Sequence, residues 1–148
     1  MKFFIAQMYT EEGVNFPFSH HMQAFWRERL SALAMPSAQF VKAYGADFTL
    51  GIRLNARKEI AESEIRGPTV FRRTKDVEYA LFLPYDVVMS AEDKCRAAVC
   101  LIVSGIQRIA DLAQVELVGF ESEKDSLIKQ TCCNPLMLLE PWSDRAPS

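Results

Sequence analysis

The sequence predicts a single α+β domain over residues 1–148, with a largely antiparallel sheet of about four to five strands and two main helices packed on one face. Three observations lead to this class. The length of 148 residues fits one domain of ordinary size. Hydrophobic residues (49%) and charged residues (24%) stand close to the averages of globular domains. Segments with strand and helix patterns follow one another in the order strand, helix, several strands, helix, strand.

Four segments have the pattern of β-strands. The opening apolar run at residues 2–9, KFFIAQMY, is typical of a buried strand. In residues 47–57, DFTLGIRLNAR, apolar residues alternate with polar residues or glycine, so one face of this strand is expected in the core. Residues 69–73 and 77–84 flank the short segment TKD and are expected to form a hairpin. The charged stretch before them, residues 56–68, is predicted to be a loop or a short helix.

Apolar residues at helical spacing predict the first helix over residues 20–34. Phe25 and Trp26 recur with the leucines that follow them at the i, i+3, i+4 spacing of one helical face. Ser19 is the predicted N-cap of this helix, and Pro36 is expected to stop it.

The strongest helical pattern lies at residues 91–114, with Ser90 as the predicted N-cap. Its main apolar stripe consists of Cys95, Val99, Ile102, Ile106, Ile109 and Ala113. Residues 115–120 are expected to return as a strand, and residues 135–142, PLMLLEPW, form an apolar tail.

The sequence predicts a cytoplasmic protein with reduced thiols and no membrane association. No apolar run approaches the roughly 18 residues of a spanning helix, and the opening segment becomes polar too early for a signal peptide. Cys95 and Cys100 lie in the apolar helix, whereas Cys132 and Cys133 are neighbours that cannot join distant segments to each other. All four cysteines are therefore expected to be unbridged.

No stretch matches a catalytic, cofactor-binding or metal-binding signature. The two histidines, His20 and His21, are consecutive at the start of a predicted helix, where neighbouring side chains diverge by about 100°. Glycine-rich loops for phosphates or dinucleotides are absent, and the six glycines are scattered singly. Glu78 alternates with Val77 and Tyr79 and is expected to face solvent or a sheet-edge partner. The sequence thus predicts no catalytic residue, metal or cofactor and favours a protein without catalysis.

Charge is unevenly distributed along the chain. Residues 27–75 contain ten basic and five acidic residues, whereas residues 76–148 contain six basic and twelve acidic residues. Arg53 lies on the polar face of its predicted strand, and Arg72 and Arg73 lie on the next one, so one of these two can join Arg53 on an exposed sheet face. The expected partner is an acidic protein surface or the chain's own acidic half. A pI near 5.7 disfavours nucleic acid.

These features predict a small, bacterial-type, cytoplasmic binding protein without catalysis, which neutralises or escorts a protein partner as immunity proteins and accessory factors do. The alternative is a pocket protein or small enzyme that takes a small apolar ligand in an aromatic-lined cavity between the first helix and the sheet. The residues expected to line that cavity are His21, Phe25, Trp26 and Tyr79.

The sequence also predicts a homodimer. The outer side of the helix at residues 91–114 carries small or weakly polar residues where a solvated helix would carry charge. These are Ala97, Cys100 and Ser104, which are flanked by Leu101 and Gly105, and the predicted interface consists of Ala97, Leu101, Ser104 and Gly105. A second copy of the helix, or the apolar tail at residues 135–142, would cover this surface, and we favour the second copy because the tail must itself be buried.

Overall fold

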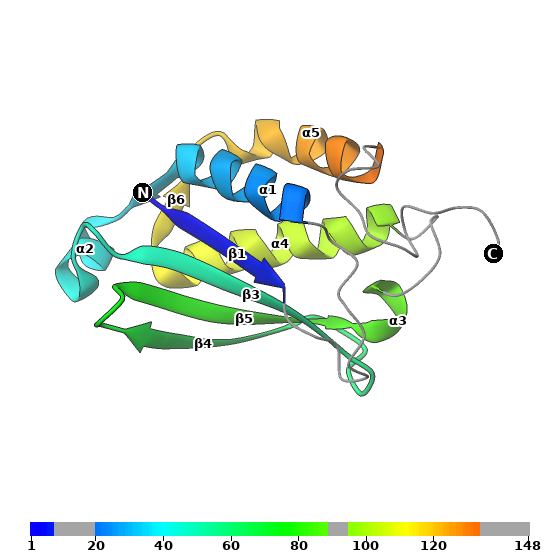
Figure 1. The fold of residues 1–148 in the computed structure, drawn as a ribbon, viewed down its shortest axis with the longest axis horizontal. Helices are drawn as coiled ribbons and strands as arrows, with labels where there is room; N and C mark the ends of the chain where they lie inside the picture. Colours follow the sequence, from blue (N-terminus) through cyan, green and yellow to red (C-terminus); the bar gives the residue numbers. More distant parts are fainter. Residues whose placement is uncertain (8–19, 89–94, 134–148) are drawn as a thin grey trace.

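The computed structural model of the chain describes residues 1–7, 20–88 and 95–133. Its strands are β1 (Phe3–Gln7), β2 (Ala34–Pro36), β3 (Thr49–Arg57), β4 (Glu64–Phe71), β5 (Asp76–Pro84) and β6 (Val115–Leu117). Its helices are α1 (His20–Leu33), α2 (Ala38–Tyr44), α3 (Tyr85–Val88), α4 (Cys95–Ala113) and α5 (Phe120–Cys133) (Figure 1). The fold over these residues is α+β, as predicted. The predicted N-caps Ser19 and Ser90 and the apolar tail at 135–142 lie outside the described residues.

The main sheet has the strand order β1-β3-β5-β4 and is mostly parallel. β1 pairs with β3, and β3 with β5, in parallel, and of the pairs in this sheet only β4 with β5 is antiparallel. The prediction of a largely antiparallel sheet is therefore wrong. The segment α1–β2–α2 crosses over the sheet and returns the chain to the end where β1 began. The predicted hairpin is present as β4–β5, but β5 inserts between β3 and β4, so that it runs parallel to β3.

Two short strands form a separate antiparallel pair beside the main sheet. The strand expected at 115–120 is present as β6, but it pairs with β2 and not with the main sheet. The backbone N–H of Val118 also donates to the carbonyl of Leu33, at 3.0 Å. The β2–β6 strand pair therefore connects the end of α1 to the end of α4.

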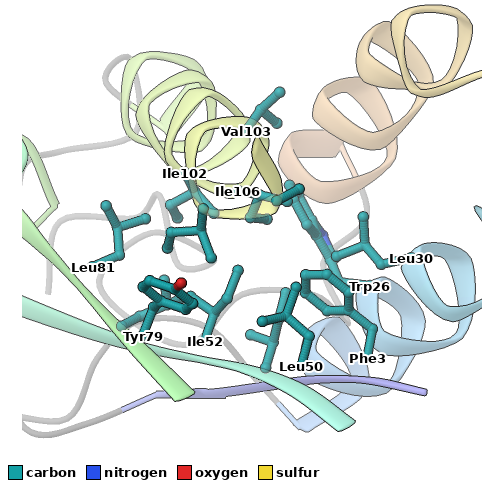
Figure 2. Packing of buried hydrophobic residues seen from close by; sticks show 14 of the residues in the cluster. Phe3, Trp26, Leu30, Leu50, Ile52, Tyr79, Leu81, Ile102, Val103 and Ile106 are labelled. Carbon is teal, nitrogen blue, oxygen red and sulfur yellow. The ribbon is translucent and has the colours of Figure 1, made fainter. Parts of the chain in front are cut away.

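The helices α1 and α4 cover one face of the main sheet, and α5 lies over them on the side away from the sheet (Figures 1 and 2). The predicted helix at 20–34 is confirmed as α1, and the apolar stripe predicted for the helix at 91–114 is buried along α4. Three long helices thus pack on this side, where two were expected. The amphipathic segment after β6 extends into α5, which buries Leu127 and Ile128.

A glycine sets the distance between α4 and the sheet. A Cβ atom added to Gly105 would lie 2.4 Å from Cδ2 and 2.7 Å from Cδ1 of Leu81 on β5. Leu81 points from the sheet toward α4 in Figure 2 and is fully buried. Any side chain at position 105 would therefore displace the Leu81 side chain or force the helix and the sheet apart.

The start of the free edge of β1 is held by hydrogen bonds to Ser31 on α1 and Ala34 on β2. The backbone N–H of Phe3 donates to Oγ of Ser31 at 2.9 Å, and that hydroxyl in turn donates to the Phe3 carbonyl at 3.4 Å. The amino group of Met1 donates to the carbonyl of Ala34 at 2.9 Å. These bonds satisfy backbone groups that an edge strand would otherwise leave unpaired.

Within the described residues, none of the helices combines the length and the apolar character needed to cross a membrane.

Candidate functional site

Of the described helices, α1 and α4 lie over one face of the main sheet (Figure 2), and we call the opposite face the open face. Side chains alternate along β3: Leu50, Ile52 and Leu54 are fully buried and face the helices, so Gly51 and Arg53 face the other way. On β5 the open-face residues are Asp76, Glu78, Ala80 and Phe82 by the same alternation. Arg53 therefore lies on an exposed sheet face, where the sequence placed it.

Two arginines flank a small residue at the centre of this face. Arg53 on β3 is in register with Ala80 on β5, and Ala80 is in register with Arg66 on β4. Because Ala80 is short, a shallow cavity of about 200 Å³ remains above it, lined by Arg53, Arg66, Thr69 and Glu78 among others. The two guanidinium groups can approach one negatively charged group from opposite sides.

Arg66, the second arginine of this pair, is held against the aromatic ring of Phe82. The Cζ atom of Arg66 lies 4.9 Å from the centroid of the Phe82 ring, and the Cζ atom of Arg57 lies 4.3 Å from the same centroid. Cation–π contacts of this kind restrict the arginine side chains while leaving their N–H groups able to donate. Arg57, Phe82 and Arg66 thus form a stacked cluster next to the cavity.

Glu78 orients Arg53. Nε of Arg53 donates to Oε1 of Glu78 at 2.6 Å, while the Arg53 side chain remains 46% exposed. Glu78 itself is only 9% exposed, so the expectation that it faces solvent is wrong. Its side chain packs across Gly51, where an added Cβ would lie 3.0 Å from the Glu78 Cγ atom. The missing side chain of Gly51 gives the carboxylate its place beside Arg53.

A larger cavity of about 540 Å³ extends from Gly51 and Glu78 around the edge of β1 to α1. The side chains of Glu78 and Asp76 line it from β5, and Arg27 and Glu28 line it from α1. Phe4 borders it from β1, 3.4 Å from the position of a Cβ on Gly51. Most of the residues that line it have charged or polar side chains, and both signs of charge are present.

Arg72 and Arg73 do not join Arg53 on the open face. β4 ends at Phe71, and both arginines lie in the exposed turn that follows it. The strand begins at Glu64, inside the stretch that was predicted to be a loop or helix, so Arg66 takes the place beside Arg53. An arginine partner was foreseen, but a different residue supplies it.

The four residues of the predicted aromatic cavity do not lie around one space. Trp26 is fully buried in the core, and its Nε1–H donates to Oγ1 of Thr131 on α5 at 2.8 Å. Phe25 is half-buried under the guanidinium of Arg29, and His21 is exposed. Tyr79 is buried; it borders two shallow cavities whose linings include none of the other three. Trp26 and Tyr79 therefore serve the closed core (Figure 2).

Burial raises the pKa of the Tyr79 phenol above its usual value of 10.0, and the nearby Tyr44 adds to this effect. The cause is the loss of solvent around a phenolate at this position. Tyr79 is consequently a neutral phenol at physiological pH.

Of the predicted dimer surface on α4, three residues face outward. Ala97 and Ser104 are exposed and Leu101 is half-buried, whereas Gly105 is buried against Leu81. Gly105 is thus mainly part of the contact between helix and sheet, although it also borders the groove described next. Leu101 and Ser104 border a groove of about 300 Å³ beside the residues that follow β3. α5 covers another side of α4, where Val103 is buried.

Comparisons with protein-family models, with curated proteins and with solved structures found no match. Within the described ranges, histidine, cysteine, aspartate and glutamate residues form no group of three or more that could hold a metal ion.

Proposed function

We propose that this protein is a cytoplasmic, bacterial-type binding protein without catalysis, which neutralises or escorts a protein partner by binding an acidic patch of that partner on the open face. The observation that carries this proposal is the row Arg53–Ala80–Arg66, in which two arginines on neighbouring strands flank a short residue above a shallow cavity. A carboxylate of the partner fits between the two guanidinium groups.

Three features support binding of carboxylates at this row. Arginine presents planar, paired N–H groups that match the geometry of a carboxylate, and it is enriched in protein interfaces. The contact with Glu78 and the stacking on Phe82 hold the two side chains before a partner arrives. Such preorganisation reduces the conformational entropy that binding would otherwise cost.

Charge reversal tests this proposal. Partners are captured from the source cells with the full chain, and the candidate is then titrated against purified protein by calorimetry. We expect Arg53→Glu with Arg66→Glu to weaken binding by about 2–5 kcal/mol, and the affinity of the unchanged protein to fall with increasing salt.

The matched control reverses two exposed basic residues on the helical side, Arg96 on α4 and Lys129 on α5. This control carries the same change in net charge and should retain the partner. Equal loss of affinity in both variants, or none in the open-face variant, contradicts the proposal.

The cavity of about 540 Å³ favours a second candidate function, the binding of a small molecule. It lies beside α1, but none of the four residues predicted for an aromatic cavity lines it, and its charged residues Arg27, Glu28, Asp76 and Glu78 suit a ligand that carries charges of both signs. Free amino acids are suitable probes in a thermal-shift assay. A stabilising ligand whose effect is lost in Asp76→Asn but kept in Lys129→Glu supports this function, and uniform inactivity of the probes argues against it.

Self-association remains part of the proposed function. The surface for it is the outer side of α4 around Ala97, Leu101 and Ser104, of which Ala97 and Ser104 are exposed and Leu101 is half-buried. This surface lies on the helical side of the molecule, so a homodimer would leave the open face available to a partner.

A further inference from the structure

Two of the four cysteines meet in the tertiary structure although 37 positions separate them. Sγ of Cys95, in the first turn of α4 as described, lies 2.7 Å from Sγ of Cys132, near the end of α5. Neither sulfur is in a disulfide. The contact results from the packing of α5 against α4, and no pattern in the sequence had brought these two cysteines together.

The two sulfurs differ in their access to solvent. Cys95 is 1% exposed, whereas Cys132 is half-buried. The other two cysteines, Cys100 and Cys133, are exposed. An oxidant can therefore reach the sulfur of Cys132 directly, whereas the sulfur of Cys95 is shielded from solvent.

We propose that Cys95 and Cys132 are a redox pair that forms a reversible disulfide by exchange with low-molecular-weight disulfides. A disulfide needs its two sulfur atoms to come within about 2.05 Å of each other, and two thiols already in contact require only a small approach. The pair therefore joins α4 to α5 without rearrangement of the fold.

The exchange proceeds in two balanced steps. Cys132 releases its proton to solvent, and its thiolate attacks one sulfur of a small disulfide such as oxidised glutathione. The small disulfide breaks, one glutathione leaves as a thiolate that takes up a proton, and Cys132 holds the other as a mixed disulfide. Cys95 then loses its proton and attacks Sγ of Cys132, which expels the second glutathione. Two protein thiols are oxidised while one small disulfide is reduced to two thiols.

Helix geometry favours this pair over the vicinal one. Cys132 and Cys133 are consecutive residues of α5, and the side chains of consecutive helical residues diverge by about 100°. A bond between them would distort the last turn of the helix, whereas a bond from Cys132 to Cys95 follows an existing contact. Exposed Cys100 and Cys133 are expected to form only mixed disulfides that dithiothreitol removes.

Mass spectrometry of the full chain treated with oxidised glutathione tests the proposal. Peptide mapping under non-reducing conditions should find the peptide of Cys95 linked to that of Cys132, with the loss of two hydrogens. Cys100→Ser and Cys133→Ser serve as matched controls and should form the same link. Cys95→Ser should instead retain a glutathione on Cys132. A link between Cys132 and Cys133, or glutathione adducts without any internal link, overturns the proposal.

A thermal readout covers the case in which a substitution of buried Cys95 impairs folding. Oxidation should raise the melting temperature of the unsubstituted chain by roughly 5–10 °C, because the bond closes a long loop, and dithiothreitol should reverse the rise. Cys132→Ser changes the half-buried partner and should abolish the rise. An unchanged melting temperature in the unsubstituted chain after glutathione treatment contradicts the proposal.

Discussion

At the scale of single residues, two positions in the contact between sheet and helices have measurable consequences. Tyr79 presents a polar group at the border of the core, and Gly105 presents none where α4 touches β5. The effect of Tyr79 on stability depends on the solvation of its hydroxyl group, whereas the effect of Gly105 depends on the space left for a side chain. Each therefore calls for a different measurement.

Tyr79 should make stability depend on alkaline pH. Its pKa is raised in the folded protein, so the folded state binds the phenolic proton more tightly than the unfolded state does. The resulting stability is fully present below the unfolded pKa of about 10 and is lost as the pH rises through the folded pKa. Urea unfolding at a series of pH values from 9 upward should show this loss, and Tyr79→Phe should flatten it. Tyr85→Phe is the control, and an identical slope in all three proteins would refute the assignment.

Gly105→Ala should destabilise the protein by about 1–2 kcal/mol. Alanine favours a helix over glycine by about 1 kcal/mol, but the new methyl group would meet Leu81 at 2.4 Å in a closed core, and we expect the clash to dominate. Denaturant unfolding measures the difference. Ser104→Ala, one position away on the exposed side, should stay within about 0.5 kcal/mol, and Leu81→Val should partly rescue Gly105→Ala. A gain in stability from Gly105→Ala would show that the sheet yields to the methyl group.

At the scale of elements, α5 is held over the rest of the domain by contacts of its inner side. It packs on α4 and α1, and its Thr131 accepts the hydrogen bond from Trp26 Nε1–H on α1. The adjacent residue, Cys132, belongs to the redox pair proposed above and contacts Cys95 on α4. Side chains at the end of one helix thus connect three elements that are distant in sequence.

Thr131→Val should cost about 1–3 kcal/mol of stability. Valine keeps the shape of threonine but leaves the indole N–H of fully buried Trp26 without an acceptor. Chemical denaturation followed by circular dichroism gives the value. The control is Ser126→Ala on the same helix, which removes a hydrogen bond to the exposed Gln130 and should have little effect. Equal costs for the two variants would mean that the buried bond contributes no more than a surface one.

At the scale of the whole molecule, the two sides of the sheet differ in the residues that they carry. The helical side contains the closed core, and the open face presents the arginine row that we propose for partner binding.

Asp47 and Lys75 form an ion pair at 2.5 Å near the end of the sheet, which lowers the pKa of the Asp47 carboxyl. Both groups are well exposed, so this pair is expected to contribute little to stability.

The predicted homodimer is a property of the whole molecule, and light scattering at micromolar concentration tests it. We expect a dimeric mass for the unchanged chain and a monomeric mass for Ser104→Arg, because a charged side chain in the centre of an apolar contact opposes association. Ser104 is exposed, so the variant should keep its fold, which circular dichroism verifies. A monomeric mass for the unchanged chain contradicts the prediction.

Patterns contained within one element were readable from the sequence. The period of apolar residues located α1 and the buried stripe of α4, and strict alternation located β3 with Arg53 on its outer face. The spacing of two strand-like runs predicted the β4–β5 hairpin. These features depend on neighbours a few positions away, and their physical basis is the fixed repeat of helices and strands.

Only the tertiary structure decided which distant residues meet. The parallel direction of β1, β3 and β5 follows from the path of the crossover segment, which no local period records. The early start of β4 brings Arg66, and not Arg72 or Arg73, next to Arg53. The packing of α5 on α4 brings Cys132 to Cys95. Pairing and packing depend on the burial of surface between elements, and a one-dimensional pattern specifies which surface is apolar without specifying its partner.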